Sequence, residues 1–429
     1  LMDDCELELI VKELEADHSE ALKEIDRELD AKTSTLSVDD YEKIQKVGQG
    51  TFGEVFKVRH KTTKEIFALK RLKIEKETEG FPITALREVR ILRSLSHKNI
   101  VSLKGICHRR NPGINGYRYE FYLLFEFCDH DLAGLLSQKV EISLPVKKGI
   151  AKQLLTGICF LHRNNILHRD LKASNILIDR TGTLKIADFG LARLTVAPSA
   201  PDRRVCYTGR VVTLWYRPPE ILLNDRCYDR PVDLWGAGCI IAELWTKCPL
   251  MQGDTEVNQL RLIINLCGSF TPATWPAVEK LEAFKNTKLP MDTKRTLREK
   301  LAPKIPCQSA LDLIDKLLAC DPSKRLDADQ SLAHEFFQEE PLAGDLSCLS
   351  QSGISFLEYL GQANRSRSVA AVAAHINNFR SAGPQSFRGR GGVLPGGLSG
   401  AMNGAANPFR YRGLPPDPDN SNINFDRIY

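Results

Sequence analysis

The spacing of apolar residues divides the chain into a strand-rich and a helix-rich region. Apolar and polar residues alternate over 41–72, with a glycine-rich interruption, and again up to Phe127, as half-buried strands require. A helical pattern at about 83–94 separates these runs, and helical steps of three and four residues dominate 147–337. This order predicts an α+β fold, in which a small β-rich lobe with one helix precedes a larger, mainly helical lobe.

The pattern also predicts three segments. We expect an acidic helical extension at 1–37, a folded domain at 38–345 and a mostly disordered tail at 346–429. The two lobes of the domain, about 38–127 and 128–345, together are long enough to bury a large core.

The first thirty residues carry apolar residues mostly at helical spacing, interrupted by Asp17 and His18. They contain twelve acids and three bases, a net charge of −9. One interpretation is a coiled-coil or partner-docking helix. The other, a solvated acidic helix, is favoured because fewer than the ~3–4 uninterrupted heptads of a coiled coil are present.

The tail changes composition after Leu360, where Ser, Ala, Gly, Asn, Pro and Arg dominate. Residues 363–413 contain seven arginines and no acid. Such a segment buries too little apolar surface to offset its chain entropy, which predicts disorder. Two interpretations of its charge stay open: contact with single-stranded RNA, which arginine–glycine segments bind electrostatically, or a solvated linker, which we favour.

Composition argues against two classes of protein. No stretch reaches the ~18–20 apolar residues of a membrane helix, so we expect no membrane partner. The twelve cysteines form no C-x-x-C pair and no histidine cluster has metal spacing, which argues against a zinc site or a disulfide framework. Residue 1 is Leu rather than Met, so the position of the natural N-terminus stays open.

A glycine-rich run at 48–55 has the form G-x-G-x-x-G-x-V, with Gly48, Gly50, Gly53 and Val55 at its fixed positions. Glycines let backbone N–H groups approach the phosphates of a nucleotide. Dinucleotide folds use a similar run, but theirs opens a helix, whereas this one lies between two predicted strands. The run therefore favours ATP binding of the protein-kinase kind.

Lys70 ends a strand-like run, seventeen residues after Gly53. A lysine at this distance is placed to bridge the α- and β-phosphates of ATP, and it needs a carboxylate to hold it. Glu88 on the next predicted helix is the natural partner. Solvated side chains are the usual state of both residue types, and the glycine run is what favours the paired interpretation.

Two short runs carry the chemistry: H-R-D-L-K-A-S-N, which ends at Asn175, and D-F-G, which begins at Asp188. In this order, Asp170 accepts the proton of a substrate hydroxyl and Lys172 neutralises the transferring phosphoryl group. Asn175 and Asp188 hold Mg²⁺. Every catalytic position is filled, which argues against a non-catalytic scaffold, and the Lys after Asp-Leu is the serine/threonine form.

Three further runs, at 82–88 (P-I-T-A-L-R-E), 127–136 and 211–220, make a family resemblance specific. Over about 38–345 the chain resembles the PITALRE-type cyclin-dependent kinases of the CMGC group, the catalytic subunits of positive transcription elongation factor b. Pro218 departs from the family's A-P-E signature, where alanine is usual. The resemblance implies the bilobal protein-kinase fold with ATP and Mg²⁺ as cofactors.

The resemblance also implies a set of nucleotide contacts. Adenine is expected between Val55, Ala68 and Leu177, with Phe125 behind it and Asp131 on the ribose side. The implied ATP-binding residues are Val47, Gly48, Gly50, Gly53, Val55, Ala68, Lys70, Phe125, Glu126, Cys128, Asp131 and Leu177.

The resemblance implies that activation needs a partner protein and a phosphate on the kinase itself. A T-type cyclin is the expected obligate activator, and the helix that carries Glu88 is expected to be held out of place until the cyclin packs against it. Thr208 matches the family's activating phosphothreonine, with Arg87, Arg169 and Arg193 to bind its phosphate.

The implied substrates are Ser-Pro sites, chiefly in the C-terminal domain of the largest subunit of RNA polymerase II, together with elongation factors, in the nucleus. Val212 stands where relatives use an unusual backbone to favour proline after the target residue. Phe52 replaces the tyrosine whose phosphorylation inhibits cell-cycle members, which favours the transcriptional branch. A related kinase with a different cyclin is the first alternative, and a non-catalytic binding scaffold is the second.

Other residues are interpreted as structural. Glu220 and Arg325 are expected to pair, and Asp233 and Trp235 to belong to the scaffold. The basic segment 108–119 has two interpretations, a contact for a cyclin or regulator and a long surface connection.

Overall fold

The computed structural model describes residues 36–50, 53–73, 83–113, 116–138, 141–195, 207, 212–350 and 355–361. All of them belong to a unit that spans Leu1–Asn364, and the second unit, Arg365–Tyr429, lies outside the described residues. The predicted acidic helix and arginine-rich tail also lie outside them.

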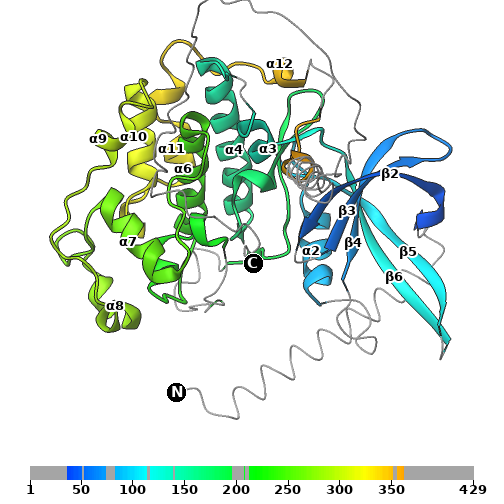
Figure 1. Ribbon diagram of the computed structural model, residues 1–429, viewed down its shortest axis with the longest axis horizontal. Helices are drawn as coiled ribbons and strands as arrows, with labels where there is room; N and C mark the ends of the chain where they lie inside the picture. Colours follow the sequence, from blue (N-terminus) through cyan, green and yellow to red (C-terminus); the bar gives the residue numbers. More distant parts are fainter. Residues whose placement is uncertain are drawn as a thin grey trace, which may run out of the picture. The chain divides into compact units, whose positions relative to one another are not determined.

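The strand-rich region folds into one six-stranded sheet (Figure 1). The strand order is β1-β5-β6-β4-β3-β2, and all neighbours are antiparallel except β1 and β5. The alternation predicted at 41–72 is confirmed, because three consecutive strands lie within it. The strands are β1 (Leu36–Ser37), β2 (Tyr41–Gly50), β3 (Gly53–His60), β4 (Ile66–Leu72), β5 (Leu103–Gly113) and β6 (Gly116–Glu126).

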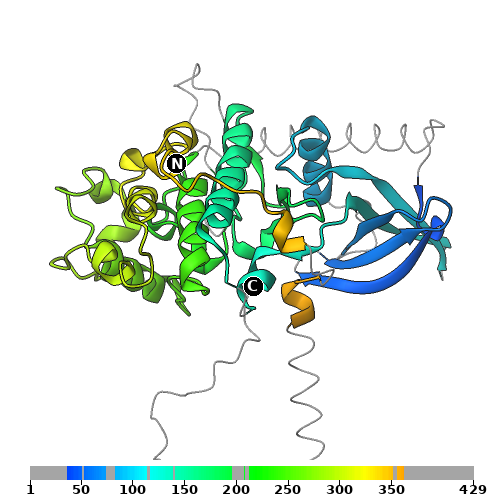
Figure 2. The same cartoon turned by 90° about the horizontal axis from the view of Figure 1, so that it is seen from above.

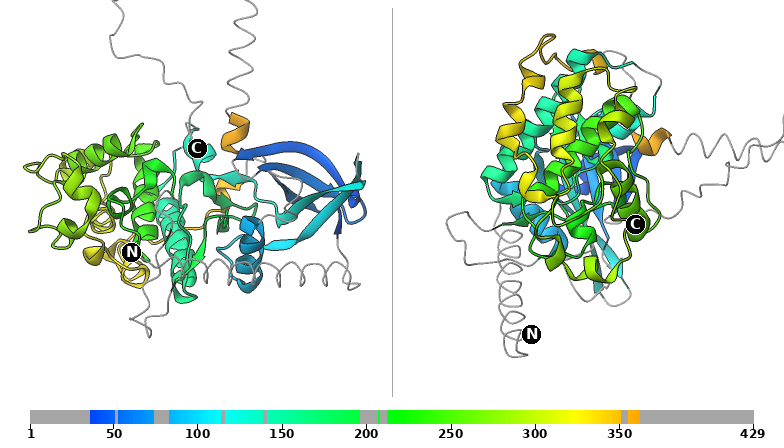
Figure 3. Two further views of the ribbon diagram at one scale, coloured as in Figure 1. Left: turned by 90° about the horizontal axis from the view of Figure 1, so that it is seen from below. Right: turned by 90° about the vertical axis from the view of Figure 1, so that its left-hand side faces the viewer.

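Among the described residues, the α-helix α2 (Ile83–Ser94) accompanies this sheet (Figures 1 and 3) and has the bounds that the sequence predicted. Ala85, Val89 and Leu92 are buried and recur at three- and four-residue steps, so they form one apolar stripe. The stripe joins the main hydrophobic core together with Phe125 of β6. Core packing therefore fixes the helix that carries Glu88.

The segment 108–119, for which the sequence left two interpretations open, forms most of a β-hairpin. It pairs in register within the hairpin of β5 and β6, from His108 opposite Phe121 to Gly113 opposite Gly116. A run of Arg, Asn, Pro and Gly has low strand propensity, so pairing with the next strand of the hairpin, rather than local preference, forms the strand.

The second lobe is mainly helical (Figure 1). Its helices are α3 (Leu132–Leu136), α4 (Leu144–Arg163), α5 (Pro219–Leu222), α6 (Pro231–Thr246), α7 (Glu256–Cys267), α8 (Glu282–Asn286), α9 (Leu297–Leu301), α10 (Gln308–Leu317), α11 (Ala328–Leu332) and α12 (Ser347–Ser350). Its short strands are β7 (His130–Asp131), β8 (Ile166–Leu167), β9 (Ile176–Ile178), β10 (Leu184–Ile186) and β11 (Arg193–Leu194).

Local sequence sets the ends of several of these helices. Thr255 caps α7 by accepting a hydrogen bond from the backbone N–H of Asn258, 3.2 Å away. Asp327 and Gln330 form a reciprocal capping box at α11. Lys247 ends α6 in the left-handed conformation, with φ +60°.

A buried ion pair joins two distant parts of the helical lobe. Arg325 donates to both carboxylate oxygens of Glu220, at 2.7 and 3.0 Å, and the two side chains are 0% and 1% exposed. The predicted bridge is therefore confirmed. Trp235 is also buried, with the guanidinium of Arg325 5.1 Å from its ring centre, as expected for a scaffold residue.

The packed chain continues beyond the domain boundary that we predicted at residue 345. Leu346 and Leu349 join the main core, and residues 355–361, here called the C-terminal strap, pack beside α3 (Figure 2). Within the strap, Leu357 is buried and the ring of Phe356 stacks on His130 at 5.4 Å. The sequence failed to show this because short apolar segments have no periodicity of their own.

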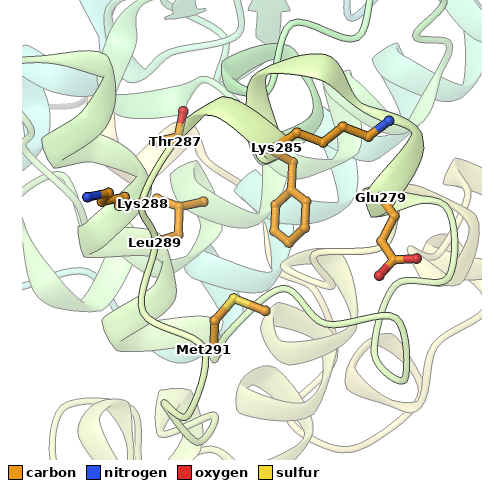
Figure 4. A pocket seen from close by; sticks show the side chains of 7 residues that line it. Glu279, Lys285, Thr287, Lys288, Leu289 and Met291 are labelled. Carbon is orange, nitrogen blue, oxygen red and sulfur yellow. The ribbon is translucent and has the colours of Figure 1, made fainter.

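A cavity of about 690 Å³ lies at α8, where no predicted catalytic or ATP-binding residue lines it (Figure 4). Its lining combines apolar and basic side chains, among them Leu289, Met291, Lys285 and Lys288. Within the described ranges, no helix is both long and apolar enough to cross a membrane.

Candidate active site

Lys70 stands at the centre of a closed ion-pair cluster. Its Nζ atom lies 2.9 and 3.1 Å from the carboxylate oxygens of Glu88 and 3.0 Å from Oδ1 of Asp188. Burial opposes the charge on Lys70, but the attraction of Asp188 and Glu88 outweighs it and raises the pKa of the ammonium group. Burial also raises the pKa of Asp188, but Lys70 outweighs it, so the net direction is downward. The predicted Lys70–Glu88 pair is confirmed.

The helix α2 lies where it closes the Lys70–Glu88 ion pair. The expectation that a cyclin is needed to bring this helix into place stays a prediction. The apolar stripe of α2 on the main core, together with the contact of Glu88 with Lys70, stabilises this position.

Asp170 is buried and its carboxylate is fully oriented. Oδ1 accepts hydrogen bonds from the backbone N–H and the hydroxyl of Thr213, at 3.1 and 2.9 Å. Oδ2 contacts Nζ of Lys172 at 3.0 Å and Nδ2 of Asn175 at 3.1 Å. Lys172 also donates to the Thr213 hydroxyl at 3.2 Å. The structure thus brings together the predicted base, its neighbouring lysine and one predicted metal ligand.

Asp233 binds the backbone of the catalytic loop, which is the H-R-D-L-K-A-S-N run at 168–175. Its two carboxylate oxygens accept the backbone N–H groups of His168 and Arg169, each at 2.9 Å, and Oδ2 also contacts Nε2 of His162 at 2.9 Å. Burial raises the pKa of Asp233, but these hydrogen bonds outweigh it and lower the pKa overall. The role predicted for Asp233, scaffold rather than catalysis, is confirmed.

The predicted adenine pocket is consistent with strand register. Val55 pairs with Lys70 across β3 and β4, and Ala68 pairs with Phe125 across β4 and β6. Cross-strand partners share a face, as do residues two apart on one strand, so these four side chains lie on one side of the sheet. Val47 lies at an irregularity of β2, between the paired residues Lys46 and Gly48.

The glycine-rich loop tolerates no side chain at Gly53. Its φ is +148°, and a Cβ there would lie 1.7 Å from the carbonyl oxygen of Arg71. Gly48 leaves more room, since its added Cβ would approach Val55 at 3.3 Å. Gly50 faces Gly53 across β2 and β3, and residues 51–52, including Phe52, lie outside the described residues.

Two of the residues implied to bind ATP, Glu126 and Cys128, have well-defined surroundings. The Glu126 carboxylate accepts the backbone N–H of Ser102 at 2.7 Å and contacts Nζ of Lys185 at 3.1 Å. Cys128 is buried, and Leu177 on β9 pairs with Asp131 on β7.

Asp131 also holds the C-terminal strap, a role the sequence did not predict. Its carboxylate accepts the backbone N–H of Gly134 at 2.6 Å and that of Glu358 at 2.8 Å. Burial raises the pKa of Asp131 to about 7, although both hydrogen bonds oppose the shift. Its expected contact with ribose stays a prediction.

The donor set suits a hard metal ion that also binds phosphates. Asn175 uses its amide nitrogen for Asp170, and Asp188 uses Oδ1 for Lys70, so each has an oxygen outside these bonds. Among the described residues, no three His, Cys, Asp or Glu side chains gather as a metal site. One carboxylate and one amide oxygen, completed by the phosphates of a nucleotide, fit Mg²⁺ rather than a metal held by protein ligands alone.

Three arginines, Arg87 on α2, Arg169 after β8 and Arg193 on β11, lie close enough to repel one another. Burial, with repulsion from Arg169 and Arg87, lowers the pKa of Arg193 to about 10, and burial with repulsion from Arg169 lowers that of Arg87. Arg169 is 1% exposed and donates to the Leu191 carbonyl and the Tyr228 hydroxyl, each at 2.7 Å. Its Nη2 atom has no hydrogen-bond partner in the described part of the chain. The cluster is therefore suited to bind an anion. Thr208 itself lies outside the described residues.

Val212 has the unusual backbone that the sequence interpretation expected. Its φ is +67°, a left-handed conformation rare for a β-branched residue. Arg217 holds the Val212 carbonyl through Nε at 3.2 Å and Nη2 at 3.0 Å.

Sequence reasoning missed Thr213 and Tyr228 as parts of the site. Thr213 directly follows Val212 and orients Asp170, while Tyr228 orients Arg169. Thr213 lies in the 211–220 run that carries the family resemblance, which is the signal that could have marked it. Tyr228 has no such signal, because only the fold brings it to the catalytic loop.

Comparisons with known proteins agree with this geometry. The protein kinase domain family matches residues 41–337. Cyclin-dependent kinase 9 of Danio rerio is 50% identical over 343 residues, covering 79% of this chain and 91% of the relative. Cyclin-dependent kinase 9 of Homo sapiens is 51% identical over 331 residues, covering 76% and 88%.

The chain belongs to the cyclin-dependent kinases, within the protein kinase family. A solved structure agrees: the crystal structure of the yeast RNA Pol II CTD kinase CTDK-1 complex has a TM-score of 0.64 and 38% identity, covering 73% of this chain and 98% of that one. This cyclin-dependent kinase is a serine/threonine protein kinase that uses ATP and a divalent metal, and its activity depends on a cyclin partner.

Proposed function

We propose that this kinase transfers the γ-phosphoryl group of ATP to Ser-Pro sites, chiefly in the C-terminal domain of the largest RNA polymerase II subunit, and so promotes transcription elongation in the nucleus. Elongation factors are further substrates. The observation that carries the proposal is the strained Val212, whose carbonyl is bound by Arg217 and therefore does not accept a substrate N–H. Proline, which has no N–H, loses nothing at such a site. The similar yeast structure, which is named an RNA Pol II CTD kinase complex, supports the polymerase as substrate.

In this proposal the residues act mainly by position and charge. Asp170, oriented by Thr213, accepts the proton of the attacking hydroxyl. Lys172, 3.0 Å from Asp170, neutralises charge on the phosphoryl group, and Lys70 bridges the α- and β-phosphates. Asn175 and Asp188 hold Mg²⁺, which when bound neutralises the phosphate charge.

We further propose that a T-type cyclin is the activating partner and that phosphorylation of Thr208 completes activation. The three arginines of the anion site, Arg87, Arg169 and Arg193, support the second part, because their mutual repulsion is relieved by a phosphate.

Reconstitution with different cyclins tests this function. The full chain is mixed with a T-type or a cell-cycle cyclin, and phosphorylation of a polymerase repeat peptide with Ser-Pro sites is measured in ATP and Mg²⁺. We expect a stable complex and activity with the T-type cyclin. A stable, active complex with the cell-cycle cyclin only would contradict the transcriptional assignment.

A further inference from the structure

We infer that Glu256, the first residue of α7, is a positioning residue for the choice of the amino acid that follows the phosphorylated Ser or Thr. The inference rests on the proposed function, because it concerns the same Ser-Pro selection. It adds a residue about 40 positions beyond the Val212 turn that acts through Arg217.

The first step concerns how Arg217 is used. Its Nε and Nη2 atoms both point to the carbonyl of Val212, which takes up one edge of the planar guanidinium group. Nη1 donates to Oε1 of Glu256 at 2.7 Å. Because the guanidinium is rigid and planar, a bond to Nη1 fixes the direction of the other two donors.

The second step concerns the environment of this ion pair. The side chain of Arg217 is only 12% exposed, whereas that of Glu256 is 49% exposed. The guanidinium of Arg217 is therefore largely buried, whereas its contact with Glu256 lies at the protein surface. An ordinary surface ion pair at such a place contributes little to stability, so its effect is expected in geometry rather than in folding.

The third step concerns the rigidity of the support. Gln259 of α7 accepts the backbone N–H of Gly253 at 2.8 Å and donates to the carbonyl of Trp215 at 3.3 Å. Trp215 in turn donates from Nε1 to the Gly253 carbonyl at 3.1 Å. These bonds tie the start of α7 to the loop that contains Val212, so Glu256 is presented at a fixed place.

The consequence concerns Val212. Its positive φ is costly for a β-branched residue, and the bonds from Arg217 help to hold it. Without Glu256, Arg217 turns more freely and the Val212 carbonyl becomes available to accept the N–H of a residue other than proline. Discrimination between Ser-Pro and Ser-Ala then falls, while the orientation of Asp170 by Thr213 is kept.

The experiment compares matched Ser-Pro and Ser-Ala peptides with the cyclin complex of the full chain. Wild type, Glu256→Ala and Glu256→Asp are assayed for kcat and KM on both peptides, together with thermal stability. Glu282→Ala is the matched control, because Glu282 is likewise the exposed first residue of a helix, α8. We expect Glu256→Ala to lower the Ser-Pro to Ser-Ala ratio of kcat/KM by about fivefold or more, and Glu256→Asp to restore part of it.

Every other outcome contradicts either the positioning role of Glu256 or the proposed Ser-Pro function. An unchanged ratio in Glu256→Ala, or an equal loss on both peptides, overturns the positioning role, since a purely structural residue affects both peptides alike. The same loss of ratio in Glu282→Ala overturns it as well. A wild-type complex that does not prefer Ser-Pro contradicts the proposed function itself, independently of Glu256.

Discussion

At the scale of single residues, the contact between Thr213 and Asp170 makes a direct prediction. Replacing Thr213 with Ala removes the hydroxyl that binds both Asp170 and Lys172, so the carboxylate loses one of the contacts that orient it. We expect kcat to fall by about 10- to 100-fold with little change in the KM for ATP. Thr213→Ser keeps the hydroxyl and is expected to retain most of the activity; equal losses in both variants would contradict this role.

Glu243 makes a second residue-scale prediction, on pH and stability. Burial raises its pKa from 4.5 to about 8, although the Tyr216 hydroxyl donates to it at 3.2 Å. Between these values the folded state keeps a proton that the unfolded chain has released, so this group makes the protein less stable as pH rises.

Glu243→Gln removes that dependence. As pH rises from about 5 to about 8, the free energy of unfolding of the variant is expected to increase by about 1–3 kcal/mol relative to that of wild type. Denaturant titration at both pH values measures this difference. Glu335→Gln, on the surface, serves as the control. If the free energy of unfolding of Glu243→Gln changes with pH as that of wild type does, Glu243 does not hold the extra proton.

The residue scale also shows what the sequence could predict. Asp170, Lys172 and Asn175 are separated by a few positions in one loop, so their meeting follows from local spacing. Thr213 reaches Asp170 from 43 positions away, and only the fold places it there.

At the scale of elements, the C-terminal strap makes a prediction about local order. Leu357 is its buried apolar anchor, and Asp131 binds its backbone through Glu358. Leu357→Ala is expected to weaken strap packing by about 1–3 kcal/mol without unfolding the domain.

Hydrogen exchange measures this directly. Amides of residues 355–361 are expected to exchange faster in Leu357→Ala, with α6 unchanged. Leu342→Ala, at an exposed position, is the control. Unchanged exchange in the strap would mean that Leu357 does not anchor it.

Elements with a strong local pattern were predictable and the others were not. The bounds of α2 follow from its apolar stripe and were predicted correctly. The extension of β5 and β6 over 108–119 was not, because a basic, proline-containing run becomes a strand only through its partner. The strap was missed for a similar reason, since its order comes from contacts with His130 and Asp131.

At the scale of the whole molecule, the three-arginine anion site links activation to stability. Phosphate on Thr208 is expected to relieve the repulsion among Arg87, Arg169 and Arg193 and to raise the melting temperature of the chain by a few degrees, on the order of 1–2 kcal/mol. Arg193→Gln should remove most of this increase, measured by comparing phosphorylated and unphosphorylated protein. Arg180→Gln, on the surface, should keep it; an increase that survives Arg193→Gln would place the phosphate elsewhere.

The closed Lys70–Glu88 pair shows that the catalytic groups of one chain already lie together. The helix α2 that carries Glu88 packs on the main core through Ala85, Val89 and Leu92. That a cyclin brings this helix into place stays a prediction.

The most direct measurement of the central claim is phosphoryl transfer by Asp170→Asn. The cyclin complexes of wild type and Asp170→Asn are assayed on the Ser-Pro polymerase peptide, with nucleotide binding measured in parallel to show that the variant is folded. Because Asn cannot accept the hydroxyl proton, we expect activity to fall by about 100-fold or more while ATP binding persists. Unchanged activity in Asp170→Asn would contradict the mechanism and the assignment of this site.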